Sequence, residues 1–236
     1  MFFCGYSQVQ VETAGSQVLY FVVSRIPEYD LRFVLERFSM IFGDKFYRLL
    51  DEMSIWQQSL FSLVLASRMS PNLYLYCNLS QDTDLREAFR KAIDAMWVYH
   101  TDKNNHVSLD IVHDDLEKVM PVPDPEGSYG AYPAFDACQA LVLAIEAITE
   151  KNGDEALNAS NISVCTVAKF LEVQEERSIS DDELRERKLM EEEMDFQVEL
   201  LSRLRRKRES SWIQELYEEF CNVTCSNIGI SSDSEL

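Results

Sequence analysis

The stretch GSYGAYPAFDACQALVLAIEAI, from Gly127 to Ile148, predicts a helix in the interior of an all-α protein. Pro133 suits the first position of a helix, and Gly130 suits a tight turn just before it. At about 100° per residue, the positions that can meet water fall within about 80° on one side: Gln139, Leu143, Glu146 and Glu150. Because the other positions up to Ile148 are apolar or small, we expect this helix at the centre of a bundle.

Asp136 and Cys138 are the residues of this stretch that bear on chemistry. The positive end of the helix dipole favours a carboxylate such as Asp136 in the early turns. A catalytic Cys138 would need a lowered thiol pKa and a histidine as base, but all three histidines are distant in sequence. Free cysteine is among the most buried residue types, so we expect Cys138 to point inward and to pack.

Helical spacing of apolar residues continues through most of the remaining chain. It predicts further helices over residues 44–69, 82–100, 108–120, 153–177, 180–187, 189–204 and 212–223. The first of these ends before Pro71 and has a break near Asp51, and another break is expected near Arg187. The sequence therefore predicts an all-α, single-domain bundle of about six to eight helices.

Three helix starts carry capping signals. Asp84 with Glu87 and Ser180 with Glu183 have the spacing of N-terminal capping pairs, and Ser108 precedes the helix that follows it. These residues place the starts of three of the predicted helices.

The two ends of the chain differ from this helical body. Residues 1–39 contain SQVQVET and VLYFVV, which are typical of strands, and LRFVLERF, which is typical of a short helix. Because Met40 could itself start translation, we expect residues 1–39 to be an N-terminal extension or a mis-assigned start. Residues 40–230 are expected to form the folded domain, and 231–236 a disordered polar tail.

The chain is strongly acidic, with 41 acidic and 22 basic side chains and a formal net charge of -19. This excess disfavours nucleic acid and anionic lipid as partners. No window approaches the roughly 20 apolar residues that span a bilayer, so no membrane association is expected. Six dispersed cysteines agree with a reducing compartment, and we expect a cytoplasmic protein.

The run RLRRKR, from Arg203 to Arg208, is the one concentrated basic segment, with five basic residues in six. It could be offered as a nucleic-acid patch. A simpler account is that ion pairs at i,i+4 neutralise this region: Asp181 with Arg185, Glu183 with Arg187, and Glu199 with Arg203.

Metal-ligating patterns are incomplete. Asp110 and His113 form one approximate half of the carboxylate–histidine motif of a di-metal bundle, and no second D/E-x-x-H occurs. Cys221 and Cys225 could share a helix face, but they supply only two ligands. The common phosphate, dinucleotide, zinc and hydrolase motifs are absent from the sequence, so no cofactor is expected.

Four segments carry a family resemblance: Trp56-Gln57, YGAYPAFDAC from Tyr129 to Cys138, SISDDEL from Ser178, and SNIGI from Ser226 to Ile230. With them the chain resembles the YjaG-like family of bacterial proteins, a domain of unknown function numbered 416. The resemblance covers roughly residues 40–230. It implies a cytosolic all-helical fold, and it implies no activity, cofactor or catalytic residue.

These observations favour a non-enzymatic function. We expect acidic helix faces to dock on a basic partner protein or to take part in self-association, and a variant is mimicry of nucleic-acid charge. The alternative is a small-molecule or metal-dependent enzyme with a pocket near the start of the Pro133 helix, walled by Tyr129, Tyr132 and Asp136. In the first case the two tyrosines are packing lids, and in the second they edge the pocket.

Overall fold

The computed structural model describes residues 41–231, so the expectations for residues 1–39 and for the tail after Ser231 lie outside this range. The described part contains nine helices: α3 (Asp44–Asp51), α4 (Ile55–Ser80), α5 (Thr83–Thr101), α6 (Leu109–Val119), α7 (Ala131–Thr149), α8 (Glu155–Glu175), α9 (Asp181–Arg185), α10 (Lys188–Leu204) and α11 (Ser210–Phe220). The extended pairing within residues 41–231 is an isolated bridge between Cys225 and Ser231. The predicted all-α, single-domain bundle is confirmed.

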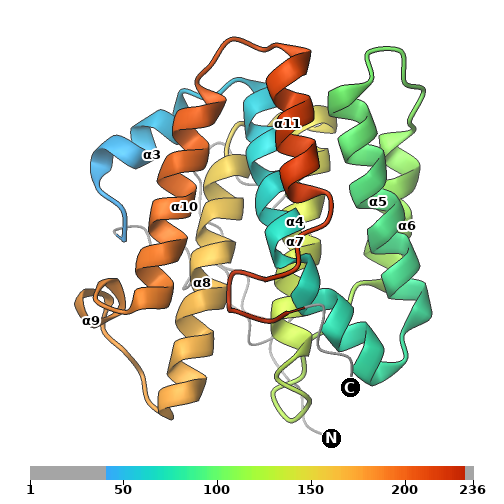
Figure 1. Ribbon diagram of the computed structural model, residues 1–236. Coiled ribbons are helices and arrows are strands. Elements are labelled where there is room, and N and C mark those ends of the chain that lie inside the picture. Colours follow the sequence, from blue (N-terminus) through green and yellow to red (C-terminus); the bar gives the residue numbers. More distant parts are fainter. Residues whose placement is uncertain (1–40, 232–236) are drawn as a thin grey trace, which may run out of the picture.

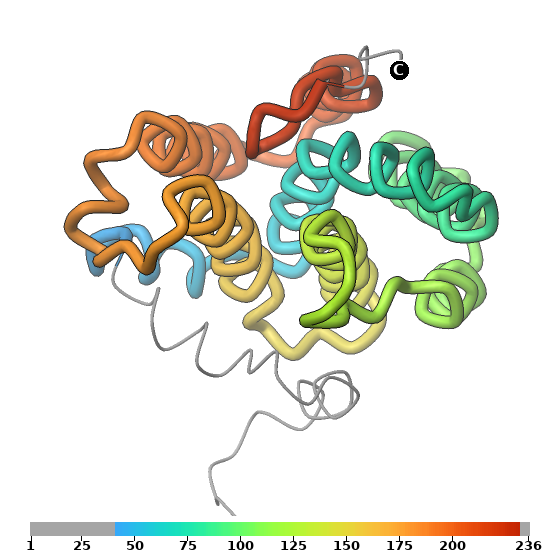
Figure 2. The backbone as a smooth tube through the Cα atoms, turned by 90° about the horizontal axis from the view of Figure 1, so that it is seen from below, coloured from blue at the N-terminus to red at the C-terminus, as the bar shows by residue number. Residues whose placement is uncertain are grey.

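The helix α7 packs most extensively against α4 and next against α8. Figure 1 shows these three helices in the middle of the bundle, with α10 and α11 in front of them and α5 and α6 at one side. In the perpendicular view of Figure 2, α6 and α10 lie on the outside of the bundle, far from each other. The central position expected for α7 is confirmed.

The details at the start of α7 differ from the prediction. The helix begins at Ala131, so Pro133 is its third residue rather than its first. Gly130 has a φ of -58°, an ordinary helical conformation, and its conformational freedom is not used. The first turn tolerates Pro133 because the N–H groups there have no intrahelical partner.

The solvent strip predicted on α7 is narrower than expected. Gln139 and Glu146 are buried, whereas Glu150 is exposed. Glu146 is covered because His113 of α6 lies against its carboxylate. The neighbouring helix α6 therefore covers part of the α7 surface that was expected to meet water.

Pro71 does not end a helix, which makes one boundary prediction wrong. It lies inside α4, which continues to Ser80. Pro71 cannot donate a hydrogen bond to the carbonyl of Ser67, but the residues around it are buried, and Met69 and Leu73 are fully buried. Packing of this buried segment offsets the missing hydrogen bond. The break expected near Asp51 is confirmed, because α3 ends there.

The capping prediction for α5 is also wrong, whereas that for α9 is confirmed. Asp82 caps α5 by accepting a hydrogen bond from the Leu85 backbone N–H at 3.0 Å. A capping box joins Ser180 and Glu183 at α9. The following break is confirmed as well, since α10 begins one residue after Arg187.

Two arginines of the α8–α11 region pair with carboxylates that are more distant in sequence than the predicted i,i+4 partners. Arg187 pairs with Glu175 of α8 at 2.9 Å, and Arg203 pairs with Glu219 of α11 at 2.6 Å. Arg185 contacts Asp182 at 2.8 Å. The Arg203–Glu219 pair connects α10 with α11, and the Arg187–Glu175 pair connects the residue before α10 with α8, a choice that sequence spacing does not reveal.

Candidate functional site

Cys138 lies in the interior of α7 and is fully buried. Burial holds the pKa of its thiol well above the ordinary range, and the nearby Cys77 and Asp136 raise it further. A thiol that stays protonated and sealed from solvent cannot act as a nucleophile. The expectation that Cys138 packs rather than reacts fits this geometry.

Asp136 is buried on the same helix, with 3% of its surface exposed. Its carboxylate accepts a hydrogen bond of 2.7 Å from the Thr166 hydroxyl of α8. Asp136 is thus directed toward α8 and does not line the pocket at the start of α7. That part of the expected pocket is wrong.

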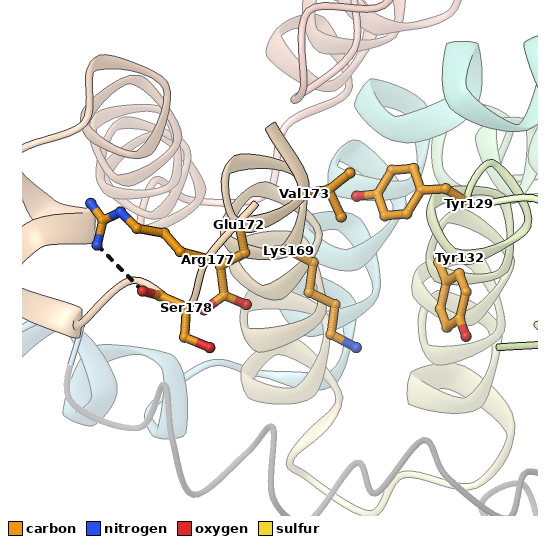
Figure 3. A pocket seen from close by; sticks show the side chains of 7 residues that line it. All are labelled: Tyr129, Tyr132, Lys169, Glu172, Val173, Arg177 and Ser178. Atoms are coloured by element: carbon orange, nitrogen blue, oxygen red, sulfur yellow. Dashed lines mark hydrogen bonds between the residues drawn. The ribbon is translucent and has the colours of Figure 1, made fainter. Parts of the chain in front are cut away.

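A pocket does lie at the start of α7, between this helix and the C-terminal half of α8 (Figure 3). Its volume is about 340 Å³, near the lower limit for small-ligand sites. Both tyrosines expected there line the pocket. The full lining consists of Tyr129, Tyr132, Lys169, Glu172, Val173, Arg177 and Ser178. The two tyrosine rings stack with their centroids 6.2 Å apart.

The charged groups of this pocket have structural contacts. Lys169 Nζ lies 5.8 Å from the centre of the Tyr132 ring. Glu172 accepts a hydrogen bond from the Ile179 backbone N–H at 3.0 Å, and Arg177 pairs with Glu175 at 2.8 Å. Burial raises the pKa of Tyr129. The pocket therefore combines two tyrosine hydroxyl groups with lysine, glutamate and arginine side chains that already have contacts, which suits binding better than proton transfer.

Asp110 and His113 do not form a metal site. Asp110 is exposed, whereas His113 turns toward α7, where its Nε2 lies 3.7 Å from Oε1 of Glu146. Within residues 41–231, no three His, Cys, Asp or Glu side chains gather in a way that could hold a metal ion. Cys221 and Cys225 lie beyond the end of α11 and share no helix face.

The outer face of α6 is a feature that the sequence interpretation missed. Ile111 is 60% exposed, although it is a large apolar residue. Asp114 and Asp115 follow it at i+3 and i+4 and share its face, and Asp110 is adjacent. All three carboxylates are exposed. Ile111 is thus an exposed apolar side chain with the carboxylates of Asp114 and Asp115 on the same face of α6.

A buried polar network joins four elements in the core. Glu193 of α10 is fully buried and forms an ion pair with Arg68 of α4, while the Ser163 hydroxyl of α8 donates to it at 2.6 Å. Asn227, from the segment after α11, receives a 3.1 Å hydrogen bond from Asn72 and donates to Ser163. The SNIGI segment therefore has a structural role, since Asn227 attaches the chain end to the core.

The Trp56-Gln57 pair also connects elements. The Gln57 side chain accepts from the Ser54 backbone N–H at 2.9 Å and donates to the Leu204 carbonyl at 2.7 Å. It therefore caps the start of α4 and the end of α10 together. Trp56 packs near Trp212, with ring centroids 6.0 Å apart.

Among the helices of residues 41–231, one, α7, is long and apolar enough to cross a membrane by length and composition. Of its most apolar window, 83% is buried inside the bundle, as in the core helix of a globular domain.

The fold and these sites define a single-domain α-helical protein with a packed centre. The chain belongs to the family described as "Protein of unknown function (DUF416)", whose model matches residues 45–231. The resemblance to the YjaG-like family is thereby confirmed.

Relatives and a solved structure agree with this assignment. The chain is 32% identical over 184 residues to the "Uncharacterized protein YjaG" of Escherichia coli K12, which covers 77% of this chain and 93% of that protein. An "Uncharacterized protein" of Haemophilus influenzae is 29% identical over 187 residues, covering 78% and 95% of the two chains. The crystal structure of a DUF416 family protein from Shewanella baltica OS155 matches with a TM-score of 0.72 and 28% identity. It covers 80% of this chain and 99% of that one.

Proposed function

We propose that this protein is a cytoplasmic interaction module that docks a basic partner protein on the outer face of α6. The observation that carries the proposal is the 60% exposure of Ile111 among the carboxylates of Asp110, Asp114 and Asp115. Protein interfaces place an apolar anchor at the centre and polar groups around it. In this interface Ile111 is the anchor and the carboxylates form the rim.

The charge of α6 selects the partner. The helix carries four acidic side chains and a single basic one, Lys118. The Lys118 ammonium group pairs with the Asp115 carboxylate, with Nζ 3.2 Å from Oδ1. A basic surface would be steered toward this face, and an acidic surface would be repelled. The exposed apolar centre suits a protein partner better than mimicry of nucleic-acid charge, which needs carboxylates without such an anchor.

Affinity purification at low and high salt tests this proposal, with the wild-type chain compared with an Asp114→Lys/Asp115→Lys variant. We expect a basic protein that is retained at low salt, released at high salt, and lost with the variant. The recovered protein, once purified, should bind the wild-type chain directly. The matched control is Glu191→Lys/Asp195→Lys on α10, which changes the net charge equally and should retain the partner. The proposal would be overturned if the recovered partners were retained equally at low and high salt and equally by the wild type and the α6 variant.

Ligand binding in the pocket at the start of α7 is the second candidate. It is favoured by the stacked Tyr129 and Tyr132 and by the Lys169 ammonium group beside them. These groups suit a planar aromatic carboxylate, which would stack on a tyrosine and face the lysine. Benzoate titrated into labelled protein should shift the NMR signals of residues around the pocket in the wild type and much less in Lys169→Met. Equal shifts in both proteins would exclude this site.

A further inference from the structure

The outward face of α10 carries a charge pattern that changes sign along the helix. Four exposed residues of α10 and the capping residue that follows its last turn, which keeps a helical conformation, form this face: Glu191, Asp195, Val198, Ser202 and Arg205. Residues seven apart lie about 20° apart around a helix, so Glu191, Val198 and Arg205 are almost in line. The line thus begins with a carboxylate, has an apolar residue at its midpoint, and ends with a guanidinium group.

The side chains of this α10 line have no salt bridge or hydrogen bond to any residue between 41 and 231. Neighbouring charges behave differently, because Lys188 pairs with Glu192 at 3.3 Å and Arg203 pairs with Glu219 at 2.6 Å. Val198 is 50% exposed. Figures 1 and 2 show α10 on the outside of the bundle.

We propose that this line pairs with the same line of a second copy of the chain, in an antiparallel arrangement around a twofold axis at Val198. Glu191 and Arg205 are each seven residues from Val198, in opposite directions. An antiparallel partner therefore places Glu191 of each copy opposite Arg205 of the other and brings the two Val198 side chains together. A twofold contact is self-complementary in this way because the same patch is used twice.

The remaining residues of the line are compatible with this pairing. Asp195 faces the region of Ser202 in the second copy, where the small side chain leaves room for close approach. Arg206 and Lys207 are exposed beside Arg205 and add positive charge opposite the acidic end of the line. Glu191 and Arg205 are 14 residues apart, about 21 Å along the helix, so the two ion-pair regions are separated by more than a screening length.

The dimer is expected to be weak and dependent on conditions. Each copy has a net charge of -19, and this repulsion acts against the local attraction. Salt at physiological strength screens the overall repulsion beyond about 8 Å. One helix from each copy also buries less surface than a standard interface, so the association should be reversible and concentration-dependent. The proposal does not rest on the α6 surface, which lies on another side of the bundle.

Sedimentation velocity over a range of concentrations, with the full chain, tests the dimer. The first variant, Glu191→Lys/Asp195→Lys, makes the acidic end basic, and the second, Arg205→Glu/Arg206→Glu, makes the basic end acidic. Each variant alone should dimerise at least about tenfold more weakly than the wild type. An equimolar mixture of the two should recover a heterodimer, because the two reversed ends then face each other with opposite charges, as do the two unreversed ends.

Matched controls separate this pairing from a general effect of net charge. Asp114→Lys/Asp115→Lys changes the charge as the first variant does, and Lys103→Glu/Lys151→Glu changes it as the second does. Both controls should dimerise like the wild type. Circular dichroism and thermal unfolding of each variant establish that it is folded. A monomeric wild type at every concentration, or a mixture that stays monomeric, would overturn the proposal and leave the α6 docking proposal standing.

Discussion

His113 of α6 lies with its Nε2 3.7 Å from Oε1 of Glu146 on α7, and this contact attaches the proposed docking helix to the central helix. At this distance the two groups form a charge contact rather than a hydrogen bond. The Glu146 carboxylate is the largest cause of a raised pKa at His113. Glu117 and Asp114 also raise it, and partial burial opposes them.

The raised pKa of His113 predicts a pH dependence of stability. A histidine whose pKa is higher in the folded state stabilises the fold below its unfolded value, about 6.5, and this contribution is lost as pH rises through the folded value. Urea unfolding from mildly acidic to mildly alkaline pH should show this loss in the wild type, and His113→Gln should remove it. His106→Gln, at an exposed histidine, should keep the wild-type slope.

The lowered pKa of His100 predicts that the stability of the fold decreases as the pH falls in the acidic range. Burial lowers its pKa to about 3, and Arg208 contributes. The Ser59 hydroxyl lies 3.0 Å from His100 Nε2 and donates to the Ala144 carbonyl at 2.7 Å, so Nε2 carries the imidazole proton. Stability from the neutral ring is complete above about pH 6.5 and should fall by about 1.4 kcal/mol per pH unit below it. His100→Gln, which keeps an amide donor, should flatten the slope in acid unfolding curves; an unchanged slope would contradict this assignment.

Thiol labelling should separate Cys138 from the surface cysteines. Cys138 is fully buried with a raised pKa, whereas Cys225 is exposed. Mass spectrometry after iodoacetamide treatment of the folded protein should find Cys225 labelled rapidly and Cys138 labelled only on unfolding. Rapid modification of Cys138 would require a chemical role for α7 to be considered again.

Removing the buried Glu193 carboxylate should cause a large loss of stability. Glu193→Ala leaves Arg68 without its partner and Ser163 without its acceptor, and should cost about 3–5 kcal/mol in urea unfolding. Glu191→Ala, two residues away but exposed, should stay within about 0.5 kcal/mol in monomeric conditions. Similar values for the two substitutions would show that the network is not a source of stability.

The sequence predicts the helices well because their apolar spacing is a local property. The burial of α7 follows from its own composition, and the capping box at Ser180 follows from two nearby residues. The boundary at Pro71 is wrong because the surrounding core, rather than local propensity, decides whether a proline continues a helix. The helix starting at Thr83 is capped by Asp82, one of several acids that local sequence cannot rank.

The sites were less predictable because they depend on contacts between distant segments. Tyr129 and Tyr132 line a pocket at the start of α7, but Asp136 does not, since its orientation depends on Thr166 of α8. Nothing local distinguishes the buried Glu193 from the exposed Glu191 and Glu192 beside it. The exposure of Ile111 likewise depends on which side of α6 the bundle covers.

Binding of the purified basic partner to Ile111→Ser tests the central claim most directly, with Ile55→Ser as control. Ile55 is also exposed, at 44%, but it lies at the start of α4. If α6 is the docking face, isothermal titration calorimetry should find the partner bound at least about tenfold more weakly by Ile111→Ser and unchanged by Ile55→Ser. A partner that binds Ile111→Ser as tightly as the wild type would contradict the account.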